Sequence, residues 1–405
     1  MKRLSLSSIS PTIWLVILVV GCLLPFVNKA FHIDDPLFLW TAQRIHAAPG
    51  DFYGFKVNWF GLEMPMIDAM CNPPLMSFLI ALASSVVGWG EVPLHLVFLL
   101  SAVAAALGTF QAAKRFCAHP LLATSLMVLT PCFLLCSTSL MCDVTMIAFW
   151  VWAFVFWERG LTSRRYANFL WAGLLAGLCV LTKYSGLSLV PLLLAYAMIR
   201  ERKVGNWAFA MLVPVLMLSV YEGIAYRTYG VVLFQQAADF SRQVNPTALA
   251  QIPSRLLGGL TFTGGCLLPA LLLLPRLWSR RVLLAGTALF LLVFLGHPLL
   301  KSLWLGVGGH GVSMAALTRD AQLTLGASWL LELQRTTWLF AGLSIAALAV
   351  REYWEHRDAT SALLGLWIVG VLVFASVFNW TINGRSILPM LPAAGMLLAR
   401  RLERT

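Results

Sequence analysis

Two adjacent carboxylates, Asp34 and Asp35, follow the first long apolar run of the chain, in the stretch FHIDDPLFLW. The next residue, Pro36, is favoured in the first turn of a helix, so the sequence predicts a helix start with Asp35 as its N-cap. Capping accounts for Asp35 but leaves Asp34 without a role. A carboxylate at such a position can accept a proton from a hydroxyl group, and Asp34 is therefore the candidate general base, with Asp35 beside it.

A third acid, Asp143, opens the later apolar stretch CDVTMIAFW. Helix capping explains this residue equally well. The alternative is that Asp143 approaches Asp34 across a bundle of helices and belongs to the same catalytic group. Two acids could hold a divalent cation, but no ligand spacing in the sequence requires one. No cofactor is therefore predicted to be required, and a divalent cation stays open.

Several cations stand at the same ends of the apolar segments. Lys183 lies in LTKYSG between two short apolar runs, with no loop to solvate it, and Tyr184 follows it. Arg385 begins the last apolar segment, and Lys56 lies in the first long connection. Each cation alone is explained by a side chain that reaches from the membrane to water. Together they predict a pocket for an anion beside lipid, most simply a lipid phosphate.

The stretch GVGGHGVS, residues 306–313, contains four glycines and His310. It lacks the Lys-Ser/Thr pair of a phosphate-binding P-loop, so a nucleotide site is not predicted. A mobile loop is one interpretation. The other is a lid over the site, formed by an outer loop at 298–329, with His310 as a candidate substrate contact.

The elements that must position these residues are membrane helices. Of the 405 residues 60% are hydrophobic and 11% are charged, with a mean hydropathy of +0.81, whereas soluble chains carry about 25% charged residues. Long apolar runs rather than two-residue alternation favour helices, so an all-α polytopic membrane protein is predicted. The net charge of +12 is explained by basic residues that set membrane topology, and no nucleic-acid module or nucleic-acid partner is predicted.

About twelve apolar segments are candidate transmembrane helices: residues 12–28, 93–113, 120–137, 144–158, 167–182, 185–200, 205–224, 256–274, 282–297, 330–350, 361–378 and 386–400. Alternate connections and the two tails hold 18 of the 29 Lys and Arg residues, among them Lys114, Arg115 and Arg159. These connections are predicted to be cytoplasmic, together with both termini. The acids then lie on the outer, periplasmic face of the plasma (inner) membrane.

The segment Pro73–Gly90 is apolar enough to look like a further span. If it crossed, every later basic cluster would change sides, so it is predicted to lie at the outer interface. Residues 29–92 then form one long outer loop with interfacial helices. The whole chain, 1–405, is predicted to be one transmembrane domain.

The order of these motifs resembles the polyprenyl-phosphate-sugar-dependent glycosyltransferases of the GT-C class, in particular family 39 with the protein O-mannosyltransferases and the lipid A aminoarabinose transferase. The resemblance lies in the acid pair of HIDDPLFLW after the first span, the segment CNPPLMSFLIAL, an acid two spans later, LTKYSGL, and the ending NGRSILPMLPAAGMLLARRL. It covers the first 200 residues and the last 30, and residues 225–340 show no likeness.

The resemblance implies a GT-C-like fold and transfer of a sugar from a polyprenyl-phosphate donor to a hydroxyl group of a lipid, glycan or protein acceptor. It implies that Asp34 is the catalytic base and that Lys183 and Arg385 hold the lipid phosphate. Some relatives have a lysine before Pro-Pro-Leu, where this chain has Asn72, which puts that phosphate contact in doubt. The second acid of the pair is often glutamate, and here it is Asp35.

Other functions compete with transfer. The runner-up is a transporter or flippase of a lipid-linked sugar, although the span centres hold almost no ionisable residues and no internal repeat is evident. A ligase or polymerase of lipid-linked glycans and a non-catalytic assembly subunit are further alternatives.

Overall fold

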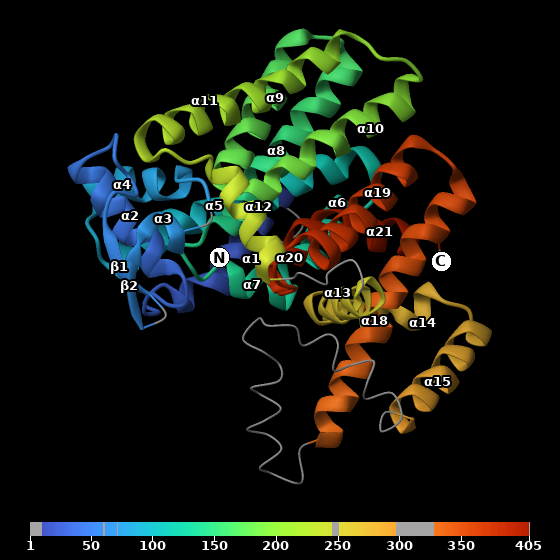
Figure 1. The fold of residues 1–405 in the computed structure, drawn as a ribbon. Helices are drawn as coiled ribbons and strands as arrows, with labels where there is room; N and C mark the ends of the chain where they lie inside the picture. The colour runs from blue at the N-terminus through green and yellow to red at the C-terminus, as the bar shows by residue number, and fades with distance from the viewer. Residues whose placement is uncertain (1–9, 60, 71, 245–250, 297–327, 405) are drawn as a thin grey trace, which may run out of the picture. The chain divides into compact units, whose positions relative to one another are not determined.

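The computed structural model describes residues 10–59, 61–70, 72–244, 251–296 and 328–404. Their regular secondary structure is helical apart from one two-stranded hairpin (Figure 1). The chain forms two compact units, which are described separately. The N-terminal unit comprises residues 1–115 and 134–237, and the C-terminal unit comprises residues 116–133 and 238–405.

The N-terminal unit begins with a helix, carries the hairpin and ends in a helical bundle. Its elements are α1 (Pro11–Leu23), η2 (Leu24–Phe26), α2 (Asp35–Ala47), β1 (Lys56–Trp59), β2 (Leu62–Pro65), α3 (Met66–Ala69), α4 (Leu75–Val87), α5 (Glu91–Phe116), α8 (Cys142–Ser163), α9 (Tyr166–Thr182), η3 (Tyr184–Ser188), α10 (Leu189–Glu201), η4 (Asn206–Met211) and α11 (Leu212–Tyr229). Three helices have residues in both units: α5, through its last residue Phe116, α7 (Pro131–Cys136) and α12 (Leu233–Val244).

The C-terminal unit consists of helices and short helical turns. They are α6 (Pro120–Val128), α13 (Ile252–Cys266), η5 (Leu268–Leu273), α14 (Leu274–Leu277), α15 (Arg280–Leu295), α18 (Ser328–His356), α19 (Ala359–Val373), η7 (Phe374–Phe378), α20 (Gly384–Ile387), η8 (Leu388–Met390) and α21 (Leu391–Leu402).

Helices α5 and α8 pack side by side and run parallel. The Thr145 hydroxyl donates to Ser101 Oγ at 3.0 Å, and the Trp152 indole donates to the Ala104 carbonyl at 2.9 Å. The residue numbers rise together along the contact, so both C-terminal ends lie at one end of the pair. Gly108 permits this approach, because a Cβ there would lie 2.4 Å from a Val151 methyl. The basic residues at the C-terminal ends of α5 and α8 therefore lie at the same end of this helix pair.

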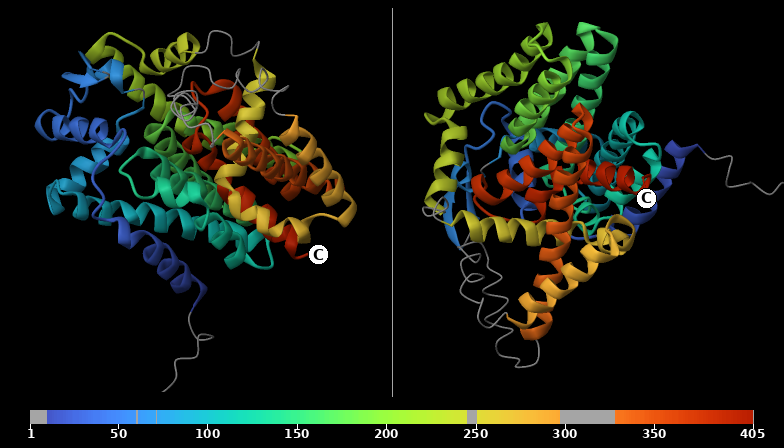
Figure 2. Two further views of the ribbon diagram at one scale, coloured as in Figure 1. Left: turned by 90° about the horizontal axis from the view of Figure 1, so that it is seen from below. Right: turned by 90° about the vertical axis from the view of Figure 1, so that its right-hand side faces the viewer.

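Helix α9 returns antiparallel along α8, and α11 packs beside α9 (Figures 1 and 2). At the start of α9 the Phe169 ring covers Gly160, where a Cβ would lie 2.7 Å from the ring. At the other end, Lys183 meets Asp143. The end of α9 is thus placed beside the start of α8.

The segment 29–92 contains the helices α2, α3 and α4 and also the hairpin of β1 and β2, which was not predicted from the sequence. That these helices lie at the membrane interface stays a prediction. The strands pair antiparallel, with Val57 opposite Met64. Helix α4 has 13 residues, about 20 Å of helix, whereas a full crossing needs about 20 residues. It packs against α2.

Five helices among the described residues are long and apolar enough to cross a membrane, or six if the bent pair α13 and η5–α14 is one span. They lie within residues 91–116, 142–163, 206–229, 329–356 and 359–378. The protein is therefore a multi-span membrane protein, and the structure does not establish twelve crossings. Proline breaks several of the predicted spans: 120–137 is divided into α6 and α7 before Pro131, and the bent pair turns by 78° before Pro269.

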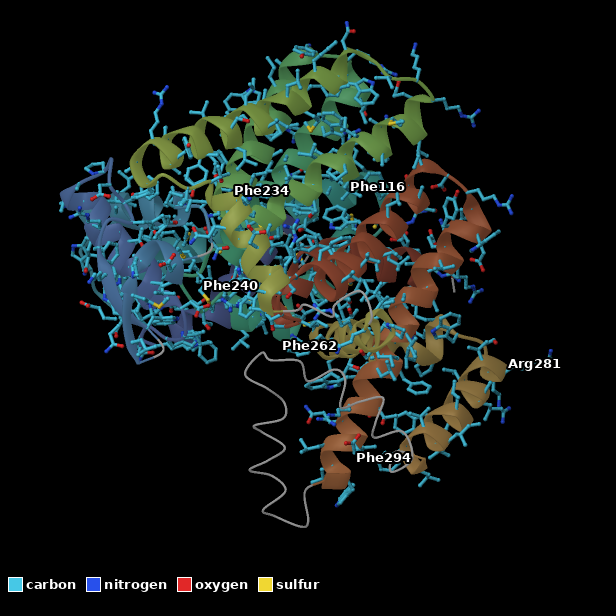
Figure 3. All side chains as sticks on the ribbon, viewed as in Figure 1. Phe116, Phe234, Phe240, Phe262, Arg281 and Phe294 are labelled. Atoms are coloured by element: carbon cyan, nitrogen blue, oxygen red, sulfur yellow. The ribbon has the colours of Figure 1, made fainter. Side chains whose placement is uncertain are left out.

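Within the C-terminal unit, α13 and α18 cross at a pair of glycines. A Cβ on Gly264 would lie 1.8 Å from the Trp338 carbonyl oxygen, and one on Gly342 would lie 1.9 Å from that of Leu260. Small residues allow such close backbone approach between membrane helices. By contrast, α15, with Arg281 at its start and Phe294 near its end (Figure 3), has no buried residue, as expected for a helix that faces lipid.

Candidate active site

The Asp35 carboxylate is fully buried and binds backbone N–H groups from two separate segments. Its Oδ2 accepts from His32 N at 3.1 Å, and its Oδ1 accepts from Leu140 N at 2.9 Å. Helix α2 begins at Asp35, and the N-cap position belongs to Asp34, whose side chain makes no capping hydrogen bond. The prediction that Asp35 caps this helix is therefore wrong, because its carboxylate is committed to joining the loop after η2 to the connection before α8.

This environment changes the acidity of Asp35. Burial raises the pKa of its carboxyl above the ordinary value, and the hydrogen bonds from His32 and Leu140 oppose that rise in part. A buried acid with two backbone donors is well suited to hold two loops together.

Lys29 and His32 extend this arrangement, and the sequence analysis gave neither a role. Lys29 Nζ lies 2.9 Å from His32 Nε2 and donates to Thr138 Oγ1 at 3.1 Å. The other ring nitrogen, His32 Nδ1, lies 3.3 Å from Asp35 Oδ2. The only signal in the sequence was the position of both residues beside the acid pair.

Asp34 is half-buried at the start of α2. The residue before it, Ile33, has a φ of 54° in the left-handed region, which is strained for a β-branched side chain. This turn places His32, Asp34 and Asp35 in succession around the helix start.

Asp143 and Lys183 form a close ion pair. Lys183 Nζ lies 2.7 Å from Asp143 Oδ1, and the side chains are 22% and 2% exposed, respectively. The second carboxylate oxygen, Asp143 Oδ2, is buried and has no hydrogen-bond partner among the described residues. Asp143 follows Leu140, the Asp35 partner, by three residues, a reach of at most about 11 Å. The ion pair and the buried acid therefore lie at the same end of the N-terminal unit.

Tyr184 lies beside a further acid that the sequence analysis missed. Its hydroxyl donates to Glu222 Oε1 at 2.9 Å, and Phe234 N lies 3.1 Å from the same oxygen. Glu222 thus joins the turn after α9 to the start of α12. Its signal was a single acid within the apolar stretch LSVYEGIAY.

The other predicted substrate-binding residues occupy separate places. Lys56 is exposed on β1, 3.4 Å from Glu63 across the hairpin. The Asn72 carbonyl accepts from the Tyr53 hydroxyl at 2.6 Å. Arg385 lies in the first turn of α20, in the C-terminal unit, beside the capping box of Asn383 and Ser386. His310 and the predicted lid lie outside the described residues, and the pocket that would unite these cations stays a prediction.

A metal site was left open by the sequence. The described residues contain no cluster of three or more His, Cys, Asp and Glu side chains that could hold a metal ion.

Part of the chain matches the model of a known family. Residues 71–222 match the model of the family described as dolichyl-phosphate-mannose-protein mannosyltransferase. This segment includes Asn72, Asp143, Lys183, Tyr184 and Glu222, whereas the acid pair precedes it. No protein of curated function matches the chain.

Solved structures give the fold. The chain is similar to the oligosaccharyltransferase of Archaeoglobus fulgidus, with a TM-score of 0.52, 15% identity, and coverage of 98% of this chain and 50% of that one. It therefore spans half the length of that protein. ArnT from Cupriavidus metallidurans bound to undecaprenyl phosphate aligns with a TM-score of 0.48, 13% identity, and coverage of 96% and 76%. The apo ArnT aligns at 0.43, with 15% identity over 97% and 78%.

The resemblance drawn from the acid pair, the Pro-Pro-Leu segment and LTKYSGL is thus confirmed by a family match that includes the last two. Residues 71–222 of this 405-residue chain are therefore similar to the dolichyl-phosphate-mannose-protein mannosyltransferase family, in line with the resemblance that the sequence motifs suggest.

Proposed function

We propose that this protein transfers a sugar from a polyprenyl phosphate to a hydroxyl acceptor, at the end of the N-terminal unit that holds Asp34, Asp35, Asp143 and Lys183. The observation that carries the proposal is the buried Asp143–Lys183 pair beside the Asp35 connection. Burying an ion pair at the end of a membrane helix costs free energy. Binding of a lipid phosphate during sugar transfer would explain why the pair lies there.

In the proposed reaction Asp34 accepts the proton of the acceptor hydroxyl. The acceptor oxygen attacks the anomeric carbon, the bond from that carbon to the phosphate oxygen breaks, and polyprenyl phosphate leaves. A single displacement inverts the anomeric centre. A positioned general base contributes about 10²–10⁴-fold, and holding donor and base together supplies the orientation that a bimolecular reaction lacks.

Lys183 stabilises the charge that grows on the departing phosphate. In the structure its ammonium is held by Asp143, which fixes its direction while one-fifth of the side chain stays exposed. Arg385 and Lys56 are proposed as further phosphate contacts, and Tyr184, Asn72 and His310 as residues near the donor. Asp35 acts by positioning the two segments it joins.

The proposed topology has twelve crossings, cytoplasmic termini and the acid pair on the periplasmic face of the inner membrane. Its support is the alternation of basic connections and the parallel pairing of α5 and α8 described above. The acceptor is then a lipid, glycan or protein exposed on that face.

A double substitution separates the catalytic role of Lys183 from its structural role. Removing one member of a buried pair strands the other, at about 3–5 kcal/mol, so we expect Lys183→Met alone to unfold readily. Asp143→Asn with Lys183→Met removes both charges, and we expect it to fold but to lose transfer by at least about 100-fold. The readout is release of polyprenyl phosphate by purified protein in detergent, with thermal unfolding in parallel.

The matched control neutralises the ion pair at the opposite end of α8 and α9, where Arg164 lies 2.6 Å from Glu201. Arg164→Gln with Glu201→Gln should keep full transfer. A folded, fully active Asp143→Asn/Lys183→Met protein would remove Lys183 from the phosphate site. A wild type that leaves every lipid-phosphate sugar intact in detergent, yet moves such lipids across vesicles, would favour the flippase.

A further inference from the structure

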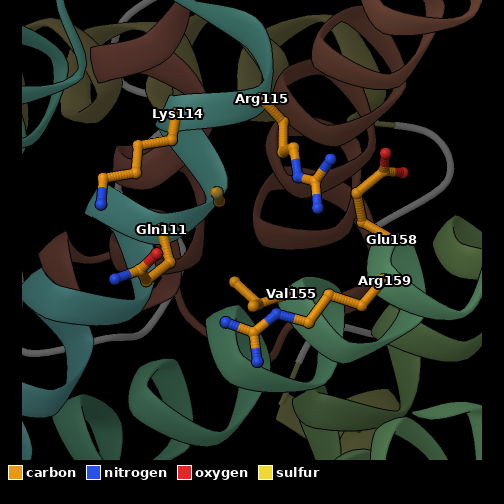
Figure 4. Close-up of a pocket in the computed structure, with 7 residues that line it drawn as sticks. Gln111, Lys114, Arg115, Val155, Glu158 and Arg159 are labelled. Carbon is orange, nitrogen blue, oxygen red and sulfur yellow. The ribbon is translucent and has the colours of Figure 1, made fainter. Parts of the chain in front are cut away.

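A basic cavity of about 310 Å³ opens at the far end of α5 and α8 (Figure 4). Gln111, Lys114 and Arg115 come from the last turns of α5. Val155, Glu158 and Arg159 come from α8. The Arg115 and Arg159 side chains reach from the two helices into the space between them.

This cavity is separate from the candidate active site. Asp143 and Arg159 lie 16 residues apart on the single helix α8, a distance of about 24 Å along its axis. Its cations belong to connections that the sequence assigns to the cytoplasm, whereas Asp143 is assigned to the outer face.

The cavity carries positive charge that has no carboxylate partner in the described part of the chain. Lys114, Arg115 and Arg159 have no carboxylate within 4.0 Å among the residues that the structure describes. Lys114 and Arg159 instead lie over phenylalanine rings, at 4.6 and 5.3 Å.

The one acid in the lining, Glu158, is already bound by two residues that do not line the cavity. Glu158 is 6% exposed, and its Oε2 accepts from the Arg200 guanidinium at 2.5 Å and from the Tyr196 hydroxyl at 2.9 Å. The cavity therefore presents three cations and an amide, Gln111, to a ligand. These groups suit phosphate oxygens, which accept strong hydrogen bonds from guanidinium and ammonium groups.

Aromatic side chains of the kind that gather at the depth of lipid headgroups lie on the helices next to the cavity. Trp152, Phe156 and Trp171 form a row across α8 and α9, with ring centroids 6.4 and 6.3 Å apart. The Arg159 guanidinium lies over Phe156, and Trp171 is 53% exposed. Tryptophan gathers where membrane meets water, and this row offers an apolar surface for acyl chains next to the cations.

We propose that this basic cavity binds the phosphate of an anionic phospholipid from the surrounding leaflet, with Lys114, Arg115 and Arg159 on the headgroup and the Trp152–Phe156–Trp171 row against its acyl chains. The lipid is a ligand of the bundle and is distinct from the sugar donor. The shared chemistry is a phosphate anion, which could also come from a soluble phosphate, and the test distinguishes these sources.

The test measures lipid retention by the purified full-length protein in neutral detergent, using native mass spectrometry during titration. The probes are phosphatidylglycerol, phosphatidylcholine, glycerol 3-phosphate and inorganic phosphate. The test variant combines Lys114→Gln, Arg115→Gln and Arg159→Gln. The control combines Arg165→Gln, Arg202→Gln and Lys203→Gln, three exposed cations outside the cavity, so both variants lose the same charge.

We expect wild type and control to bind phosphatidylglycerol equally, and the test variant to bind it at least about tenfold more weakly. A charge-keeping variant, Lys114→Arg with Arg159→Lys, should bind like wild type, which separates lost charge from lost fold. Equal binding by the test variant and the control would overturn the proposal. So would phosphate or glycerol 3-phosphate binding as tightly as the lipid, which would make this a site for soluble phosphate.

Discussion

At the scale of single residues, the Asp35 carboxylate joins the loop after η2 to the connection before α8. Both of these hydrogen bonds come from backbone N–H groups, and each N–H group loses its acceptor when the carboxylate is removed. The Asp35 carboxylate therefore positions these two segments in the structure.

Asp35→Ala should destabilise the protein by about 2–6 kcal/mol, because each of two buried donors left without an acceptor costs about 1–3 kcal/mol. Thermal unfolding in detergent measures this loss. Glu63→Ala, on the exposed hairpin, is the control and should change stability by less than about 0.5 kcal/mol. An Asp35→Ala protein as stable as that control would show that the two segments hold together without this acid.

The sequence marked Asp34, Asp35, Asp143 and Lys183 as unusual, because charge beside apolar runs is costly and therefore conspicuous. It did not pair Asp143 with Lys183, which are 40 residues apart. Nothing in spacing or charge order specifies which cation a buried acid takes. Lys29 and Glu222 were missed for the same reason, since their significance lies in partners brought close only by folding.

At the scale of elements, hydropathy predicted where helices lie, but not where they break. Apolar composition is the same on both sides of Pro131, so one span of 17 or more residues and two short helices look alike in the sequence. The β1–β2 hairpin was missed because its strands have only four residues each, too short for an alternating pattern to be evident.

The crossing of α13 and α18 tests the packing of the C-terminal unit. Gly342→Val should lower the yield of folded protein and its melting temperature, because side-chain atoms would overlap the Leu260 carbonyl, at about 1–3 kcal/mol or more. Gly286→Ala on α15 has open space around its Cβ and should be neutral. Size-exclusion profiles and thermal melts report both outcomes. A Gly342→Val protein that behaves like Gly286→Ala would contradict the close crossing.

At the scale of the whole molecule, the sequence predicted a multi-span helical membrane protein from composition alone, and the structure confirms that class. The number of crossings depends on how short and broken helices sit in lipid. Hydropathy alone does not settle that, since α4 and α9 are both apolar and both shorter than 18 residues.

Cysteine labelling in intact cells tests the proposed topology. Glu63→Cys places a thiol on the hairpin of the outer loop, and Lys203→Cys places one in a basic connection; both positions are exposed. A membrane-impermeant maleimide should label the first in intact cells and the second only after permeabilisation. Wild type measures the background from native cysteines. The reverse labelling pattern would contradict the proposed topology, because it would place the hairpin and the acid pair on the cytoplasmic side.

The most direct test of the account is sugar transfer by Asp34→Asn, measured as release of polyprenyl phosphate from labelled donors by purified protein at matched concentration. Glu63→Gln, an exposed acid of the same loop, is the control. The account predicts that Asp34→Asn folds like wild type and loses about 10²–10⁴-fold in rate, as removal of a general base requires, while the control keeps full activity. Transfer by Asp34→Asn at the wild-type rate would contradict the assignment of Asp34 as the base.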